Sequence, residues 1–303
     1  MNTLYKSIGI SKQSFHQKMD RMNQVVSEQK QLLLLIYQIR EDHPTMGCRD
    51  MYYKLQPQTM GRDAFEMFCK EEDLIVERIR NRQRTTDSSG VVRFDNLILN
   101  LTISRINQVW QSDITYFQVN GNFYYITFIE DAYSRRVVGH YVSKRLFTEQ
   151  TTLPALEMAI NQRKNSNLEG LIFHSDGGGQ YYDKAFIRLT QQHKINNSMC
   201  EYPWENGKVE RLNGVIKNNY LKHRKINSFN ELVKEVDRNV QLYNEQKPHI
   251  KLNRKTPLEF ENHYICEGKK SKEGEGGSTA PFLSKDNISI NMSYKSIKTV
   301  NVI

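Results

Sequence analysis

Cysteine is scarce in this chain, and none of its copies stands in a metal-binding pattern. The four cysteines are Cys48, Cys69, Cys200 and Cys266. No Cys-x-x-Cys occurs, and the eight histidines supply no His-x₃-His pair that could complete a zinc site. We therefore expect no structural zinc, and we interpret the cysteines as thiols in a reducing compartment.

Long apolar runs are also missing. The longest block, Leu32–Tyr37, is far shorter than the roughly 18 residues that a membrane span requires. The first residues lack the charge–apolar–cleavage pattern of a secretory signal. We therefore expect a cytoplasmic protein with no membrane partner.

Acidic side chains are outnumbered by basic ones. The 303 residues contain 43 Lys and Arg against 34 Asp and Glu, a formal net charge of +9. The excess is concentrated in residues 105–225, which carry 16 basic and 11 acidic side chains. A basic chain favours a polyanionic partner, most simply DNA or RNA. The hydrophobic content of 38% indicates a globular protein, and the length allows two or three domains.

Residues 1–77 have the pattern of a small helical region. Ser11 is a candidate N-cap, and Pro44 and Pro57 separate successive helical segments. The expected helices are Asn23–Arg40, Cys48–Leu55 and Arg62–Glu72. Three short helices with tight breaks are typical of a helix-turn-helix-like DNA-binding region, and any small helical bundle is the alternative.

Residues 78–104 are predicted to be a basic linker. Arg80, Arg82 and Arg84 alternate with other residues and are followed by a polar stretch. Such a run can follow the phosphates of DNA, so we assign these arginines to DNA binding. A solvated charged tether explains the same pattern.

Residues 105–262 are predicted to form an α/β domain. Two strand-like segments, Val109–Gln118 and Asn122–Ile129, flank an Asn120-Gly121 pair, which is a strong hairpin signal. A third strand, then alternating helices and strands, predicts a mixed sheet, antiparallel at first and parallel later. Residues 263–303 are rich in Gly, Lys, Glu and Ser and are expected to be a flexible linker and carboxyl-terminal tail.

Three carboxylates stand out against this background. Asp113 interrupts an apolar strand, Asp176 follows a short buried strand, and Glu210 lies on a predicted helix. Burying Asp113 is unfavourable unless it binds a cation. Asp176 sits where α/β sheets open into ligand crevices. Oxygen ligands of this kind suit Mg²⁺, and two such ions can promote displacement at a phosphate.

Each acid also has a simpler interpretation. Asp176 precedes three glycines and could cap a turn. Glu210 stands between Lys208 and Arg211 and could be a surface charge of the helix. Asp131 and Asp183 are rival acids, which we interpret as a turn residue and a helix N-cap.

Several motifs in one order resemble the catalytic core shared by retroviral integrases and insertion-sequence transposases. The resemblance covers residues 107–260, about half of the chain. The matching segments are Trp110–Tyr116, Asp131–Arg135, His174–Tyr181, Glu210–Lys217, Tyr243–Asn244, Pro248–His249 and Thr256–Pro257. The amino-terminal helices resemble the DNA-binding region of OrfB-type transposases, from insertion sequences whose reading frames are split into OrfA and OrfB.

The resemblance implies an RNase H-like fold with a DDE site. It assigns the catalytic and metal-binding triad to Asp113, Asp176 and Glu210, with two Mg²⁺ or Mn²⁺ ions. Lys217 lies two helical turns after Glu210. Integrases have a lysine at this position that contacts DNA near the cut, so the resemblance implies the same role for Lys217. We extend DNA binding along the same helix to Lys208, Arg211 and Asn213.

Two departures from the family pattern affect the site. The family usually has 35 residues between the second aspartate and the glutamate, and this chain has 33. The shortening falls in the loop before the helix, so Glu210 is expected to keep its place, with Glu201 and Glu205 as alternatives. Lys247 replaces the usual arginine before Pro248, which loses bidentate geometry toward phosphate.

The resemblance thus implies a bacterial, nucleoid-associated DNA transposase that cleaves element ends and transfers strands, acting as a homo-oligomer on DNA with a possible OrfA-like partner. Two alternatives stay open. One is a DNA-binding regulator or assembly factor with an inactive catalytic fold. The other is an RNase H-type nuclease that cuts without joining.

Overall fold

The computed structural model describes residues 9, 11–76, 94–200 and 207–273, the last seven of them without side chains. The chain divides into two compact units, Met1–Tyr264 and Ile265–Ile303, and the first contains the site discussed below. Within the described ranges, no helix combines the length and apolar character of a membrane span.

The amino-terminal region consists of three helices around a small core of its own. They are α2 (Lys12–Asp42), α3 (Cys48–Leu55) and α4 (Arg62–Glu71). Ser11 caps α2 as predicted, because its Oγ accepts a hydrogen bond from the backbone N of Ser14 at 3.0 Å. Ile36, Met51 and Phe65 are completely buried where the three helices meet. The three predicted helices are confirmed, and the first is longer than predicted.

The central element is a five-stranded mixed sheet with the order β3-β2-β1-β4-β5. The strands are β1 (Val109–Val119), β2 (Asn122–Asp131), β3 (Val137–Ser143), β4 (Ile172–Ser175) and β5 (Asn196–Met199). The first three pair antiparallel, whereas β4 and β5 extend the sheet in parallel. Asn120 and Gly121 both have positive φ, as a tight hairpin turn requires. The predicted change from antiparallel to parallel pairing is confirmed.

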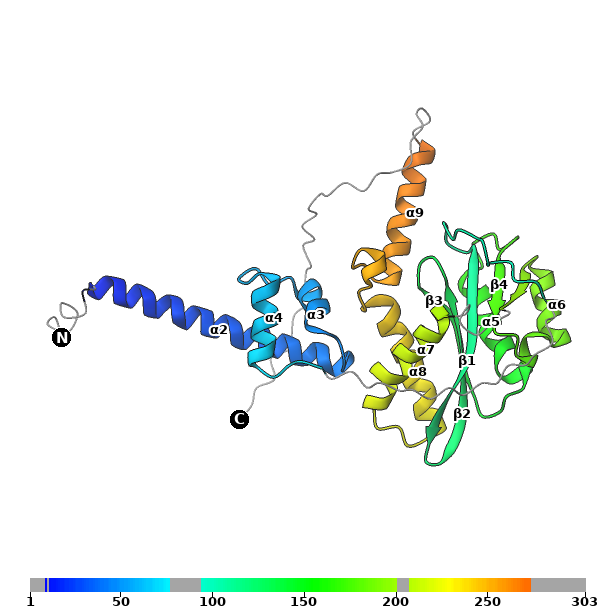
Figure 1. Cartoon of the computed structure of the whole chain (residues 1–303), viewed down its shortest axis with the longest axis horizontal. Helices are drawn as coiled ribbons and strands as arrows, with labels where there is room; N and C mark the ends of the chain where they lie inside the picture. The colour runs from blue at the N-terminus through cyan, green and yellow to red at the C-terminus, as the bar shows by residue number, and fades with distance from the viewer. Residues whose placement is uncertain (1–8, 10, 77–93, 201–206, 274–303) are drawn as a thin grey trace. The chain divides into compact units, whose positions relative to one another are not determined.

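Helices cover both faces of this sheet (Figure 1). On one side lie α5 (Thr152–Gln162) and α6 (Lys184–Gln192), and on the other α7 (Gly207–Asn219) and α8 (Phe229–Glu245). Strand alternation supplies both cores: Phe128 packs into the α7–α8 cluster, and its neighbour Ile129 into the α5 cluster. This layered arrangement is the RNase H-like fold that the sequence predicts.

The remaining elements are short, apart from one helix. The 3₁₀ helices are η1 (Thr148–Gln150), η2 (Gly179–Tyr181), η4 (Leu221–His223) and η5 (Ile250–Leu252), and the last α-helix is α9 (Pro257–Glu273). The flexible linker predicted to begin at residue 263 is wrong for residues 263–273, which continue α9. That stretch contains a single glycine and no proline. Its Lys and Glu residues are good helix formers, so their abundance is compatible with a helix as well as with a linker.

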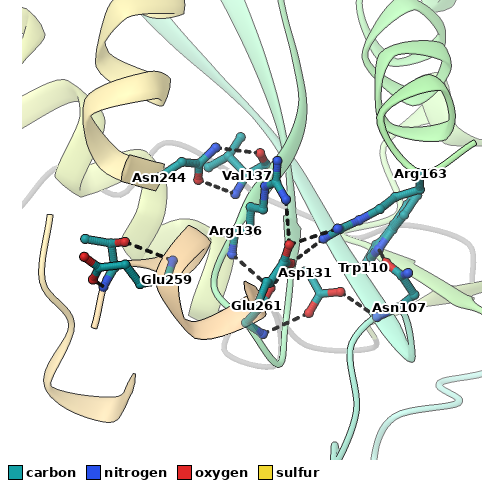
Figure 2. Close-up of polar contacts among 11 residues, drawn as sticks. Asn107, Trp110, Asp131, Arg136, Val137, Arg163, Asn244, Glu259 and Glu261 are labelled. Atoms are coloured by element: carbon teal, nitrogen blue, oxygen red, sulfur yellow. Dashed lines mark hydrogen bonds and ion pairs between the residues drawn. The ribbon is translucent and has the colours of Figure 1, made fainter. Parts of the chain in front are cut away.

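A buried ion cluster fixes the first turns of α9 to the sheet (Figure 2). The Glu261 carboxylate accepts hydrogen bonds from Arg136 Nη1 at 2.6 Å, Arg163 Nη1 at 2.9 Å and Ser134 Oγ at 2.7 Å, and it also pairs with Arg163 Nη2. Burial alone would raise the pKa of Glu261, but these partners bring it below its ordinary value. The cluster therefore keeps a buried carboxylate ionised and joins β2–β3, α5 and α9.

The two rival acids are occupied by the fold. Asp131 is buried and accepts hydrogen bonds from the backbone N of Asn107 at 2.7 Å and of Tyr133 and Ser134 at 3.0 Å (Figure 2). Asp183 caps α6 by accepting from the backbone N of Ala185 at 2.8 Å. Both acids therefore make the local backbone contacts that the sequence predicts.

We predict that Glu261→Gln lowers the free energy of unfolding by about 3–5 kcal/mol, because it leaves buried Arg163 and partly buried Arg136 without a counter-charge. The loss should be largest at neutral pH. The folded-state pKa of Glu261 lies below its unfolded value, so the contribution disappears as the pH falls through the folded pKa. Urea denaturation at pH 7 and pH 3 measures both effects.

The matched control is Glu169→Gln, in which the lost partner is Lys194 at 2.9 Å on the surface. This exposed pair should change stability by less than about 1 kcal/mol. Equal effects of the two substitutions would contradict the role given to the Glu261 cluster.

Candidate active site

Parallel pairing of β1 and β4 brings two aspartates to the same edge of the sheet. The pairing ends at Ser112 opposite Ser175, so Asp113, the next residue of β1, lies beside Asp176, the residue that follows β4. Both side chains are only partly exposed. The sequence predicts Asp113 within a strand and Asp176 just after one, and the register is the physical reason why the two lie together.

The loop after β4 is shaped by a glycine that no other residue could replace easily. Gly177 has a φ of +81°, and a Cβ there would lie 2.2 Å from Met199 Cε and 2.8 Å from the Tyr182 hydroxyl. The resulting turn lets the backbone N of Gly178 donate to Asp176 Oδ1 at 3.1 Å. The turn contact expected of Asp176 therefore exists.

Helix α7 carries the third acid. Val209, Leu212 and Ile216 are buried against the sheet, which fixes the rotation of the helix about its axis. Glu210, in the first turn, is largely exposed. The charge of Glu210 raises the pKa of Asp113, and the charge of Asp176 raises the pKa of Glu210. All three carboxylates therefore lie near one another.

Asn213 holds Asp113 rather than facing solvent. Its Nδ2 donates to Asp113 Oδ2 at 2.6 Å, and the backbone N of Ile114 donates to Oδ1 at 2.9 Å. The Asn213 side chain is only 6% exposed. Both oxygens of Asp113 thus have a fixed donor, and Asn213 lies one turn after Glu210 on the same helix.

The electrostatics of the site disfavour three ionised carboxylates. Burial, followed by the charges of Asp176 and Glu210, raises the pKa of Asp113 to about 7. Burial also raises the pKa of Asp176, and burial together with the charge of Asp176 raises that of Glu210. Such mutual repulsion is what a bound cation would relieve.

The donor set suits a hard divalent cation, because it consists of carboxylate oxygens alone. Within the described part of the chain, however, no three Asp, Glu, His or Cys side chains already stand at the mutual spacing of a metal shell. Asp113 and Asp176 form the fixed part of the site. Glu210 is exposed and has to turn toward them to complete a shell.

Lys217 lies at the edge of β1 beside the carboxylates. Its Nζ donates to Thr115 Oγ1 at 3.1 Å and stands 4.7 Å from the centroid of the Tyr116 ring. Burial and the neighbouring Lys222 lower its pKa, while Asp113 raises it. The positive charge of Lys217 therefore lies close to the site carboxylates.

The other residues assigned to DNA binding have different surroundings. Arg211 is exposed on α7, whereas Lys208 is half-buried with its Nζ 3.4 Å from the carbonyl of Ala132. Burial and then the charge of Arg135 lower the pKa of Lys208. The arginines of the predicted linker, Arg80, Arg82 and Arg84, and the alternative ligands Glu201 and Glu205 lie outside the described residues.

A row of buried polar side chains, centred two residues before Asp113 on β1, was not predicted from the sequence. Gln111 stands between Glu130 on β2 and His174 on β4, and all three are at most 2% exposed. Burial raises the pKa of Glu130 to about 8, although Arg135 opposes this, and the Tyr243 hydroxyl donates to Glu130 at 3.3 Å. The signal for this row in the sequence is Glu130, an acidic residue inside the apolar segment of β2.

We predict that Asp113→Asn stabilises the metal-free protein increasingly as the pH rises. The folded-state pKa of Asp113, about 7, exceeds the ordinary value of 3.8, so the wild type loses stability as the pH rises from about 4 to about 7. The difference between variant and wild type should be near zero at pH 4 and on the order of 2–4 kcal/mol at pH 8. Urea denaturation in EDTA measures it.

The control is Asp183→Asn, which retains the N-cap of α6 and should leave the pH profile unchanged. Parallel pH profiles for wild type and Asp113→Asn would contradict the burial and crowding described for Asp113.

Comparison with known proteins places these features in a family. Two family models, both described as integrase core domain, match residues 104–202 and residues 191–257. The insertion element IS600 uncharacterized 31 kDa protein of Shigella sonnei is 29% identical over 82% of this chain and 92% of its own length. Transposase InsF for insertion sequence IS3A of Escherichia coli (strain K12) is 36% identical over 31% of each chain.

Among solved structures, the HTLV-2 integrase catalytic core domain in complex with magnesium aligns with a TM-score of 0.42 and 22% identity, over 51% of this chain and 95% of that one. The two family matches overlap and together span residues 104–257. Residues 104–257, about half of the chain, therefore belong to the integrase core domain family.

Proposed function

We propose that this protein is a DNA transposase that cuts the ends of a mobile element and joins them to target DNA, with Asp113, Asp176 and Glu210 as its catalytic, metal-binding triad. The single observation that carries the proposal is that Asp113 of β1 lies beside Asp176 at the end of β4 in an integrase core domain, with Glu210 of α7 near enough for its charge to raise the pKa of Asp113. Their mutual repulsion has no structural benefit unless a cation binds there.

Two Mg²⁺ or Mn²⁺ ions fit the donor set, since every donor is a carboxylate oxygen and Asp113 and Asp176 stand side by side. When bound, such ions supply Lewis acidity for the in-line displacement at a phosphate. Asp113 and Asp176 hold fixed positions, and Glu210 closes on them from the exposed first turn of α7.

The protein's own groups orient the reacting parts. Asn213 fixes the Asp113 carboxylate through its 2.6 Å hydrogen bond and is a positioning residue. Lys217 holds DNA beside the cut through its charge, anchored on Thr115. Water then cleaves the strand to leave a 3′ hydroxyl, and that hydroxyl attacks a phosphodiester of the target.

DNA is the partner at more than one place in this proposal. Residues 1–77 act as a helix-turn-helix-like DNA-binding region, and residues 78–104 follow the phosphates through Arg80, Arg82 and Arg84. In the core, which spans residues 105–262, exposed Arg211 is favoured over half-buried Lys208 for phosphate contact. The buried Asn213 serves the carboxylate instead.

Two element ends have to be cut and joined together, so the proposed working form is a homo-oligomer on DNA in the bacterial nucleoid. An OrfA-like protein is a possible additional partner. The Shigella relative is named for an insertion element, and this chain covers 92% of its length, which supports action on such an element.

We predict that Asp113→Asn, Asp176→Asn and Glu210→Gln each abolish Mg²⁺-dependent nicking of element-end DNA. Loss of several kcal/mol of transition-state stabilisation corresponds to a fall in rate of about 1,000-fold or more. DNA binding should remain near that of the wild type, because the variants keep all basic side chains. Nicking gels and fluorescence anisotropy on one set of substrates measure the two properties.

Asp183→Asn is the matched control, an Asp to Asn change in the same domain but away from the site, and it should nick like the wild type. Normal nicking by all three site variants would refute the proposed triad.

We also predict that the wild type takes up Mg²⁺ in isothermal titration calorimetry and that Asp113→Asn does not. The substitution removes a charged ligand that the cation needs. Absence of uptake by the wild type in the presence of element-end DNA would favour the regulator with an inactive catalytic fold.

A further inference from the structure

The hairpin of β1 and β2 continues beyond the point where β4 supports it. Pairing between β1 and β4 stops at Ser112, so from Asp113 onward this edge of β1 carries no strand in the described sheet. In Figure 1 the hairpin extends past α5 and α6, the helices on one face of the sheet, while α8 packs against its other face. The site carboxylates therefore stand where a free strand edge begins.

Two aromatic side chains are exposed on this free part of the hairpin. Tyr116 is 36% and Phe123 52% exposed. The register pairs Tyr116 with Tyr125 and Gln118 with Phe123, which puts both rings on the same face of the hairpin. Their centroids lie 5.5 Å apart at an interplanar angle of 78°. A ring pair in this arrangement leaves an aromatic face open to solvent.

Lys217 connects this ring pair to the carboxylate site. Tyr116 and Asp113 point to opposite faces of β1, but the Lys217 ammonium reaches around the free edge to both Thr115 Oγ1 and the Tyr116 ring. Lys222 is close enough to lower the pKa of Lys217, so two cations lie near this edge. Positive charge next to open aromatic rings is the combination that binds single-stranded nucleic acid.

We propose that Tyr116 and Phe123 form a stacking platform for unpaired DNA bases next to the scissile phosphate, with Lys217 contacting the backbone between platform and carboxylates. The inference rests on the proposed function, since it extends the path of the same DNA strand. Unpaired bases are the occupant because bases inside a duplex already stack on their neighbours and offer no face to a ring.

The test places 2-aminopurine at the positions that flank the cut in element-end DNA with frayed ends. Binding to the wild type should change its fluorescence through stacking, and Tyr116→Ala and Phe123→Ala should each abolish that change. Both alanine variants should also bind frayed-end DNA about tenfold more weakly while binding blunt duplex equally well. Tyr116→Phe and Phe123→Tyr, which keep a ring, should behave like the wild type.

Tyr264→Ala provides the control, because Tyr264 is a 36% exposed aromatic residue on α9, outside the parts of the chain assigned to DNA binding. It should leave the 2-aminopurine signal unchanged. Thermal melting of each variant verifies folding, and the ring-keeping variants preserve the test if an alanine variant unfolds.

Three results would overturn the platform. They are an unchanged fluorescence signal in both alanine variants, an equal loss of affinity for blunt and frayed DNA, and a change in oligomeric state without a change in fluorescence, which would make the rings a protein contact. If the wild type nicks DNA in Mg²⁺ and one of these results appears, the platform alone fails. If the wild type does not nick at all, the proposed function fails.

Discussion

The proximity of like charges where β4 ends beside β1 is the constraint on which the rest of this structure depends. Parallel pairing sets Asp113 beside Asp176, and α7 adds Glu210 to the same neighbourhood. A fold gains nothing from holding repelling carboxylates together in a partly buried place. The arrangement makes physical sense for a site in which a bound cation neutralises this repulsion.

The surrounding architecture keeps that unfavourable arrangement in place. The apolar residues of α7 pack this helix against one face of the sheet, and the hydrogen bond from Asn213 to Asp113 links the helix to β1. Behind them, the buried Glu261 cluster ties α9 and α5 to the β2–β3 turn. A rigid scaffold of this kind fixes two acids, while the exposed first turn of α7 leaves the third able to adjust.

Local signals in the sequence were sufficient for much of this fold. The Asn120-Gly121 turn, the Ser11 and Asp183 caps and the strand-like segments of β1 and β2 each depend on near neighbours, and they appear in the structure as predicted. The triad was named from motifs that resemble a family, and the register of β1 with β4 then gave the reason why its aspartates are adjacent.

Contacts between distant residues could not be predicted in the same way. Asn213 was assigned to DNA because its helix is basic, but its partner lies 100 residues earlier in the chain. The Glu261 cluster and the buried row of Glu130, Gln111 and His174 likewise depend on strand register and helix docking. The predicted start of the tail is wrong because a high content of charged residues indicates exposure to solvent but does not exclude a helix. Helix α9 continues through charged residues that are good helix formers.

The central claim is that Asp113, Asp176 and Glu210 converge on the same divalent ions, and anomalous diffraction from crystals of the protein with cut element-end DNA and Mn²⁺ tests it most directly. The account predicts manganese peaks within coordination distance of oxygens from all three side chains, with Glu210 turned toward the aspartates. Manganese bound elsewhere, or bound at the aspartates while Glu210 still faces solvent, would contradict it.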